Sequence, residues 1–270
     1  MTHERRQFLI DEEQKKVDAV RKLQEAIQPN SPNQRIAIDL SFDAIMNEKE
    51  INSLSKQIKF SYGVLRQMET PFALSLFRCS PALRQGLDRF SAANWHVLWH
   101  DAPVSEVLEP SNVVYLSPDS PNVLEALDAS KTYVIGGIVD KTRRKGETLK
   151  AAEIAGVQTA RLPIQEHIKE RLDHILNVNT VVEVLCRFHE NGGNWERALK
   201  ESLPQRKQAS AGRRALRRRR AQDQATTTTT EEDAHDVETA ATLSVKQSSA
   251  AEQQANEVDA QADELDAARD

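Results

Sequence analysis

One carboxylate, Asp140, stands between an apolar run and a basic run. Residues 132–139 read "TYVIGGIV", which predicts a buried strand, and the pair Gly136 and Gly137 indicates that another group approaches its backbone closely. Ligands of open α/β sheets bind outside the carboxyl ends of strands, so Asp140 is placed to meet one. The alternative is a turn-forming Asp140 and a solvated basic loop made by the next cations, Lys141, Arg143, Arg144 and Lys145.

Further turns at strand ends and helix starts carry small or turn-forming residues. Ser117 ends a predicted strand, while Ser120 and Pro121 favour the start of a helix. The alternative is an ordinary strand-to-helix turn without a ligand. Two later turns hold the pairs Leu162 and Pro163, and Asn177 and Asn179.

Common nucleotide-binding and catalytic fingerprints are missing from the sequence. The nine glycines form neither a dinucleotide-binding nor a phosphate-loop motif, and no nucleophile elbow or H-E-x-x-H motif is present. His96 and His100 fall in a predicted strand and turn, which favours ordinary histidines over metal ligands. Cys79 and Cys186 lie far apart, which argues against structural zinc and against a disulfide framework.

Apolar strands alternate with amphipathic helices between residues 34 and 204. This order predicts βαβ units and a mostly parallel sheet, so the expected fold class is α/β. We expect strands over 35–40, 72–77, 95–99, 112–117, 132–139 and 157–162. We expect helices over 42–67, 81–90, 120–128, 146–156, 179–193 and 194–204, the last two capped by Asn179 and Asn194.

The two ends of the chain differ from this central part. Residues 1–28 are charged with apolar positions at roughly helical spacing, which predicts a helix that docks weakly or waits for a partner, before a linker at 28–33. Residues 206–220 hold eight cations and no acid, and apolar periodicity is absent beyond them, so 208–270 is predicted to be disordered. The expected organisation is therefore a segment 1–33, a domain 34–207 and a tail 208–270.

Composition places the chain in a broad class but names no partner. The net charge of −5 conceals local runs of either sign, and the cysteine usage favours a reducing compartment. No apolar run approaches the roughly 20 residues of a membrane span. The N-terminus lacks the apolar core of a signal peptide and is too acidic for a typical mitochondrial presequence, so we expect a soluble protein of the nucleus or cytoplasm.

Six motifs together resemble one family. In chain order they read "IDLSFD", "YLSPDSPNVL", "YVIGGIVDKTRRKG", "TARLPI", "ILNVNTVVEVL" and "NWERAL…LPQRK". Their order and spacing are similar to those of the eukaryotic tRNA (guanine-N1-)-methyltransferases that modify the ninth nucleotide of tRNA. The resemblance covers roughly residues 35–207. It implies the fold of the SPOUT class, a mostly parallel α/β sheet with a C-terminal trefoil knot, in a protein that works as a monomer.

The resemblance also implies S-adenosylmethionine as the cofactor, bound in a bent conformation among the loops of the knot. The glycine pair is then expected to leave room for it. Carried over by position, the cofactor-binding residues are Leu116, Ser117, Gly136, Gly137, Lys141, Thr142, Arg143, Arg144, Lys145, Leu149, Leu162, Pro163, Ile175, Leu176, Asn177, Val178 and Asn179.

In this family the aspartate that matches Asp140 is the proposed general base. Guanine N1 carries a proton at neutral pH, and a carboxylate that accepts this proton contributes typically about 10²–10⁴-fold to the rate. The nucleotide must first be unstacked or flipped out of the folded tRNA. Phosphate contacts are expected from the basic residues Lys131, Arg143, Arg144, Lys145, Arg161, Arg206 and Lys207.

Other functions remain open at this level. The family usually has a longer and more basic N-terminal extension, whereas residues 1–33 carry six basic and six acidic side chains. Some relatives methylate N1 of adenine at the same position, and a non-catalytic tRNA-binding subunit would retain the same motifs. An unrelated doubly wound α/β enzyme is the last alternative.

Overall fold

The computed structural model describes residues 3–139, 146–169 and 174–203 of the 270-residue chain. Several predicted features therefore lie outside the described residues: Asp140, the run Lys141–Lys145, Arg206, Lys207 and the tail over 208–270. The described part belongs to one unit that ends at Leu203. The boundaries predicted at 33/34 and 207/208 stay predictions.

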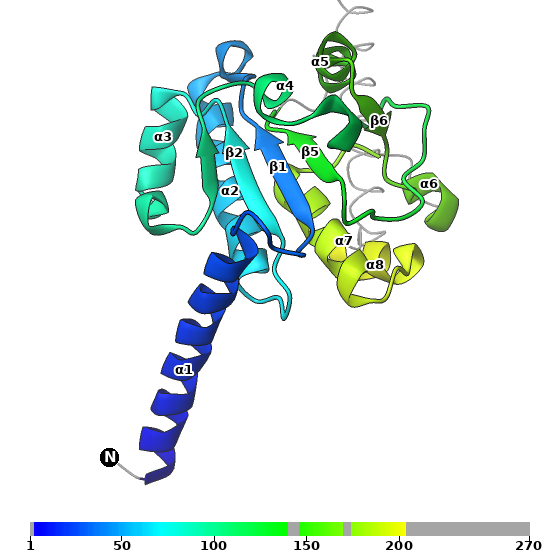
Figure 1. The fold of residues 1–270 in the computed structure, drawn as a ribbon. Helices are drawn as coiled ribbons and strands as arrows, with labels where there is room; N and C mark the ends of the chain where they lie inside the picture. Colours follow the sequence, from blue (N-terminus) through cyan, green and yellow to red (C-terminus); the bar gives the residue numbers. More distant parts are fainter. Residues whose placement is uncertain (1–2, 140–145, 170–173, 204–270) are drawn as a thin grey trace, which may run out of the picture. The chain divides into compact units, whose positions relative to one another are not determined.

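A parallel sheet forms the centre of the fold (Figure 1). Within the described residues it has six strands in the order β3-β2-β1-β5-β4-β6, and every recorded pairing between them is parallel. The predicted α/β class is thus confirmed. The strands are β1 (Arg35–Asp39), β2 (Ala73–Phe77), β3 (Leu98–His100), β4 (Val113–Leu116), β5 (Thr132–Gly136) and β6 (Gln158–Ala160).

Two strands begin or end three residues away from their predicted positions. β5 stops at Gly136 rather than at 139 because its partner β1 ends at Asp39, opposite Gly136. The next amide, of Gly137, donates to the Asp39 carbonyl at 2.7 Å and closes the ladder. β3 begins at Leu98 rather than at 95, since Trp95 stacks on the Tyr62 ring at 4.6 Å instead of joining the sheet.

Helices cover both faces of the sheet. They are α1 (His3–Ala26), α2 (Glu48–Leu65), α3 (Pro81–Asp88), α4 (Val104–Val107), α5 (Glu147–Ala155), α6 (Ile164–His167), α7 (Val178–Glu190) and α8 (Trp195–Ser202). Short 3₁₀ turns occupy Asp43–Ile45, Ala92–Asn94 and Pro110–Asn112. Local sequence explains several starts: Asn47 and Glu50 form a capping box before α2, and Asn194 accepts the Arg197 amide before α8 as predicted.

The helix predicted over 120–128 is wrong. This segment runs alongside Arg161, whose amide donates to the Asn122 carbonyl at 2.8 Å and whose carbonyl accepts from the Leu124 amide at 2.9 Å. Ser120, expected to cap a helix, instead exchanges a hydrogen bond with the Thr159 hydroxyl at 2.9 Å. Pairing with distant residues has overridden the local helical pattern, which is only a weak preference.

Helix α7 starts two residues earlier than predicted. Its N-cap is Asn177, and Asn179 lies inside the helix. The Val178 amide donates to the Gln57 side chain of α2 at 2.9 Å, so a buried side chain 121 residues away satisfies this helix end. The predicted capping role of Asn179 is therefore wrong.

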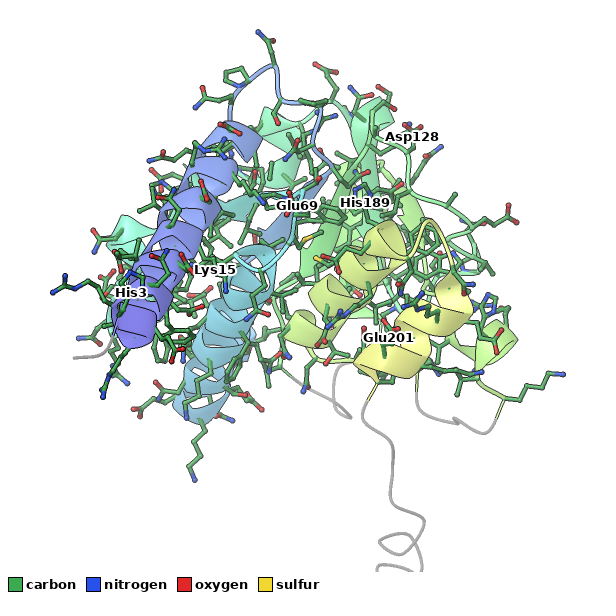
Figure 2. All side chains as sticks on the ribbon, turned by 90° about the horizontal axis from the view of Figure 1, so that it is seen from below. His3, Lys15, Glu69, Asp128, His189 and Glu201 are labelled. Atoms are coloured by element: carbon green, nitrogen blue, oxygen red, sulfur yellow. The ribbon has the colours of Figure 1, made fainter. Side chains whose placement is uncertain are left out.

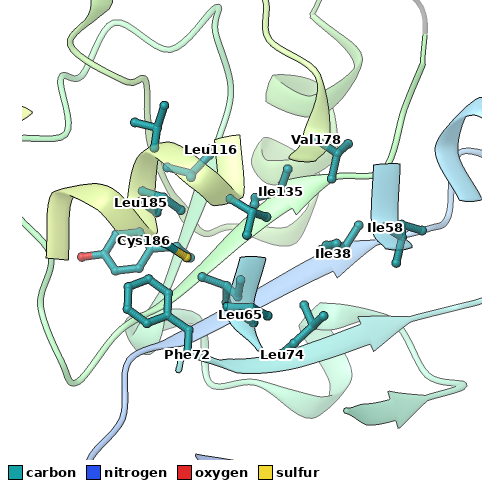
Figure 3. Packing of buried hydrophobic residues seen from close by; sticks show 14 of the residues in the cluster. Ile38, Ile58, Leu65, Phe72, Leu74, Leu116, Ile135, Val178, Leu185 and Cys186 are labelled. Carbon is teal, nitrogen blue, oxygen red and sulfur yellow. The ribbon is translucent and has the colours of Figure 1, made fainter. Parts of the chain in front are cut away.

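Alternate residues of the strands belong to two hydrophobic cores, one on each face of the sheet. Ile36, Ile38, Leu116 and Ile135 pack with α2 and α7 in the larger cluster, where side chains from both helices meet those of the strands (Figure 3). The opposite face holds a smaller cluster: Ala37, Phe77, Val104, Val113, Tyr115, Val134 and Ala152, from four strands with α4 and α5. Burial on both faces explains why β4 and β5 read as continuous apolar runs.

Helix α1 docks only by its last turns. Leu23 and Ala26 are buried there, while Phe8 and Val17 are exposed, which confirms the weakly docked helix expected near the N-terminus. Charged side chains, Lys15 among them, line the exposed part (Figure 2). No helix in the described ranges has both the length and the apolar character needed to cross a bilayer.

Candidate ligand-binding site

A cavity of about 220 Å³ opens at the carboxyl ends of β4 and β5. A water molecule occupies about 30 Å³ in the liquid, so the space admits part of an organic ligand. This is the edge of an open parallel sheet at which ligands usually bind. The lining comprises Leu116, Ser117, Pro118, Asp119, Ser120, Ile135, Gly136, Ile138, Gly146, Glu147, Thr148, Arg161, Leu162, Gln165, His174, Ile175, Leu176, Val178 and Val181.

The floor of the cavity is an extension of the larger core. Leu116, Ile135 and Val178 both line the cavity and belong to the buried cluster, and they lie together at its β4–β5 end (Figure 3). Leu162 adds a further buried side chain from the segment after β6. An apolar floor with a few polar groups around it is the usual composition of a small-molecule site.

The space beside the two glycines at the end of β5 is occupied by other groups of the protein. A Cβ on Gly136 would lie 2.3 Å from the Thr148 methyl carbon, and one on Gly137 would lie 2.8 Å from the Asp39 carbonyl oxygen. The predicted close approach is confirmed, but the approaching groups belong to α5 and β1. The room left by the glycines is therefore occupied by the chain itself, and only Gly136 borders the cavity.

Two hydrogen bonds join the turn after β4 to the start of α5. The Thr148 hydroxyl donates to Ser117 Oγ at 2.9 Å, and the Gly146 amide donates to Asp119 Oδ2 at 2.9 Å. Gly146 is the N-cap of α5 with φ of +80°, a conformation that favours glycine. Both sides of this junction line the cavity, so its wall is assembled from segments about 30 residues apart in sequence.

Arg161 borders the cavity as half of an ion pair. Its guanidinium donates two hydrogen bonds to the Glu166 carboxylate, at 3.0 and 2.6 Å. These hydrogen bonds lower the pKa of Glu166 and raise the pKa of Arg161. Arg161 was predicted to bind RNA phosphates; its charge is balanced locally by Glu166 in this structure.

Lys131 lies at the opposite edge of the sheet. It precedes the first residue of β5, and its ammonium donates to the Ser111 carbonyl just before β4. The cavity borders the other ends of these two strands. The RNA-binding role of Lys131 stays a prediction, but the residue is separated from the cavity by the length of the sheet.

His174 contributes a buried nitrogen that has no partner within the described residues. Its Nδ1 is inaccessible to solvent and makes no hydrogen bond there, although the side chain lines the cavity. A buried polar atom without a partner costs stability, typically about 1–3 kcal/mol. A ligand with a polar edge could satisfy this atom while its apolar part covers the floor.

Asp39 lies at the same edge of the sheet as the cavity, but its carboxylate is hydrogen-bonded to other groups of the protein. It accepts hydrogen bonds from the Tyr115 hydroxyl at 2.9 Å, the Ser41 hydroxyl at 2.5 Å and the Ser41 amide at 3.1 Å. Burial, then the nearby Asp39 carboxylate, raises the pKa of Tyr115 well above its usual value. Asp39 does not line the cavity, and among the described residues no group of three or more histidines, cysteines or carboxylates is arranged for a metal ion.

The cavity brings together about half of the cofactor residues expected from the resemblance. Those that line it are Leu116, Ser117, Gly136, Leu162, Ile175, Leu176 and Val178, whereas Gly137, Leu149, Pro163, Asn177 and Asn179 do not. Arg161 was expected only as an RNA contact. The cavity is also lined by residues that were not expected as cofactor contacts: Pro118, Asp119, Ser120, Ile135, Ile138, Gly146, Glu147, Thr148, Gln165, His174 and Val181.

Some of the missed residues had a local signal. Pro118 and Asp119 follow Ser117 directly, and Gly146 and Glu147 follow the basic run, so extending each turn by two residues would have included them. His174 directly precedes the predicted Ile175, so the same extension would have included it, but only the tertiary fold shows that its nitrogen is buried beside the cavity.

Comparison with known proteins gives consistent matches. Residues 1–208 match the family described as tRNA (guanine(9)-N(1))-methyltransferase TRM10/TRM10A. Over 188 residues the chain is 39% identical to the tRNA methyltransferase 10 homolog A of Rattus norvegicus, covering 68% of this chain and 55% of the rat protein. The chain thus spans about half the length of that curated relative.

Two crystal structures resemble the fold. That of spTrm10(74) has a TM-score of 0.60 and 36% identity, covering 63% of this chain and 94% of the other. That of full-length spTrm10 in complex with SAH has a TM-score of 0.58 and 35% identity, covering 66% of this chain and all of the other. The chain therefore belongs to the tRNA (guanine(9)-N(1))-methyltransferase TRM10/TRM10A family.

Proposed function

We propose that this protein transfers the methyl group of S-adenosylmethionine to N1 of guanine at position 9 of tRNA. The observation that carries the proposal is a cavity at the carboxyl ends of β4 and β5, whose lining includes seven of the residues that the family resemblance named for the cofactor. Family membership supports the reaction, although the curated relative of the rat is longer than this chain and is covered over 55% of its length.

The cavity fits S-adenosylmethionine in its chemistry. Leu116, Leu162 and Val178 offer an apolar surface for the adenine ring. The Nδ1 atom of His174, which has no partner among the described residues, offers a polar contact at its edge. S-adenosylmethionine supplies an electrophilic methyl group on a sulfonium. The full-length spTrm10 that is 35% identical to this chain was crystallised with SAH, the product left after that methyl is transferred.

Asp140 is proposed as the general base. It lies outside the described residues, one position beyond Val139 and four beyond Gly136, which borders the cavity. Its carboxylate would accept the N1 proton of guanine as the new bond to carbon forms. The cations at 141 and 143–145 would bind the phosphates around the target nucleotide, leaving the base free to be flipped toward the cavity.

The finer architecture is proposed from the family as well. We propose that the chain after β5 forms the trefoil knot of the SPOUT class, which the similarity to the spTrm10 structures supports. Composition supports a disordered tail over 208–270, since few apolar residues are available there to form a core. Two further proposals are a monomeric enzyme, which the resemblance implies, and a location in the nucleus or cytoplasm, which is the expectation from the sequence.

A methylation assay with defined tRNA tests the reaction. The purified full chain and S-adenosylmethionine are incubated with one tRNA transcript in two forms, guanine or adenine at position 9, and the product nucleosides are identified by mass spectrometry. N1-methylguanine from the first transcript alone is the expected result. N1-methyladenine alone would establish the adenine alternative. No methylation, together with no SAH binding in calorimetry, would favour a non-catalytic tRNA-binding subunit.

A further inference from the structure

Ser117 is a buried hydroxyl whose acceptor capacity is already used. The side chain is 2% exposed and lines the cavity. Its oxygen accepts from the Thr148 hydroxyl at 2.9 Å and from the Asp119 amide at 3.3 Å. A serine hydroxyl has two lone pairs and one proton, so only the proton remains to be placed.

That proton has no acceptor within the described part of the chain. None of the hydrogen bonds recorded there has Ser117 Oγ as its donor. Since Ser117 lines the cavity, an oxygen or nitrogen of a bound ligand can accept this proton.

Thr148 is held firmly enough to impose this orientation. It sits at the second position of α5, and its methyl carbon fills the space left by the missing side chain of Gly136. Threonine is branched at Cβ, so fixing the methyl group also fixes the position of the hydroxyl oxygen. The contact with Gly136 therefore holds the Thr148 hydroxyl where it can donate to Ser117.

A neighbouring serine provides the contrast. Ser120 also lines the cavity and is 3% exposed, and its hydroxyl lies 2.9 Å from that of Thr159 with either atom able to donate. Ser120 can thus give its proton to Thr159 and needs no ligand. The two serines have similar burial and similar partners, but Ser120 can act as the donor to its threonine, whereas at Ser117 the threonine is the donor.

We propose that Thr148 is a positioning residue, which orients the Ser117 hydroxyl to donate a hydrogen bond to the bound cofactor. The inference rests on the proposed function, because it takes the occupant of the cavity to be S-adenosylmethionine or its product. Thr148 acts through Ser117 and has no role in the methyl transfer itself. It should therefore affect binding of the cofactor and leave the chemical step unchanged.

The test measures SAH affinity of full-length variants by isothermal titration calorimetry. Thr148→Val keeps the methyl group over Gly136 but loses the hydroxyl, and Thr148→Ser does the reverse. We expect Thr148→Val to weaken binding about five- to tenfold, the scale of one neutral hydrogen bond, and Thr148→Ser to restore most of it. Thr159→Val removes a hydrogen bond of the same length beside Ser120 and should change the affinity less than about twofold.

A double variant separates positioning from independent binding. If Thr148 acts through Ser117, Ser117→Ala combined with Thr148→Val should bind SAH no more weakly than Ser117→Ala alone. In steady-state methylation, Thr148→Val should raise KM for S-adenosylmethionine and leave kcat unchanged. Melting temperatures of all variants establish that each is folded at the assay temperature.

The outcomes distinguish the inference from the proposed function. If the unaltered chain binds SAH and Thr148→Val binds it with the same affinity, the inference alone is overturned. Strictly additive losses of affinity in the double variant would also overturn it. If the unaltered chain binds no SAH, the proposed function falls, and the inference falls with it.

Discussion

The ends of β1 and β4 lie at the same edge of one sheet and differ in how their polar groups are satisfied. At the end of β1, Asp39 takes hydrogen bonds from Ser41 and Tyr115 and is closed off from the cavity. At the end of β4, Ser117 accepts two hydrogen bonds but has a proton left over, and it borders an open space.

The difference shows that position at the carboxyl edge does not by itself make a site. After β1 the chain turns inward, and Leu40 and Phe42 join the core. After β4 the turn meets the start of α5 and the segment before α7, and these three leave a cavity between them. A site forms where distant segments converge without filling the space.

The largest effect on activity is expected for a substitution at Asp140, the residue after Val139. The comparison is with Asp39, which ends β1. We expect Asp140→Asn to lower the single-turnover rate of guanine methylation about tenfold or more, because general base catalysis is lost. SAH affinity should remain close to that of the unaltered chain.

Asp39→Asn is the matched control. It should reduce the free energy of unfolding by about 1–3 kcal/mol by disturbing a buried hydrogen-bonded carboxylate, with little change in the rate per folded molecule. Equal single-turnover rates for Asp140→Asn and the unaltered chain would remove Asp140 as the base.

A smaller effect is expected from adding a methyl group at Gly136, the last residue of β5, and at Gly137, the residue after it. Gly136→Ala would collide with the Thr148 methyl group, and overpacking of this kind costs about 1–3 kcal/mol of unfolding free energy. Because the obstacle is a side chain, Gly136→Ala combined with Thr148→Ala should be more stable than Gly136→Ala alone in urea denaturation.

Gly137→Ala offers the contrasting case. Its methyl group would meet the Asp39 carbonyl oxygen, which is backbone, as well as the Leu40 side chain. Combining it with Thr148→Ala should therefore bring no recovery. If Thr148→Ala restored the free energy of unfolding equally at both positions, the obstacle at Gly137 would not be the backbone carbonyl.

The smallest effect is expected at the ion pair beside the cavity. Glu166→Gln should change the free energy of unfolding by less than about 1 kcal/mol at neutral pH, since the pair is partly exposed to solvent. Arg161 lowers the pKa of Glu166, so the pair stabilises the fold above the unfolded-state pKa of a glutamate. This advantage should disappear as the pH falls through the lowered pKa, as urea denaturation of both proteins at pH 7 and pH 3 would show.

The sheet was predictable because each strand is a short apolar run bounded by turns. All six strands were expected within a few residues of where they lie. The failures came where a distant partner decided the outcome: Arg161 keeps 120–128 from forming a helix, and Gln57 satisfies the start of α7 at Val178.

The candidate site was predictable only as far as turns can be read from the sequence. Leu116, Ser117 and Leu162 were expected from the resemblance and do line the cavity. Thr148 was not expected, because its importance comes from contacts with Ser117 and Gly136, which lie 31 and 12 residues away. Contacts of that kind follow from how α5 packs on the sheet and leave no local pattern.

A crystal structure of the full chain with SAH tests the central claim most directly. SAH is expected at the carboxyl ends of β4 and β5, with its adenine over Leu116, Leu162 and Val178 and an acceptor atom within hydrogen-bonding distance of Ser117 Oγ. Density for SAH at another part of the molecule, with this cavity filled by side chains or solvent, would contradict the account.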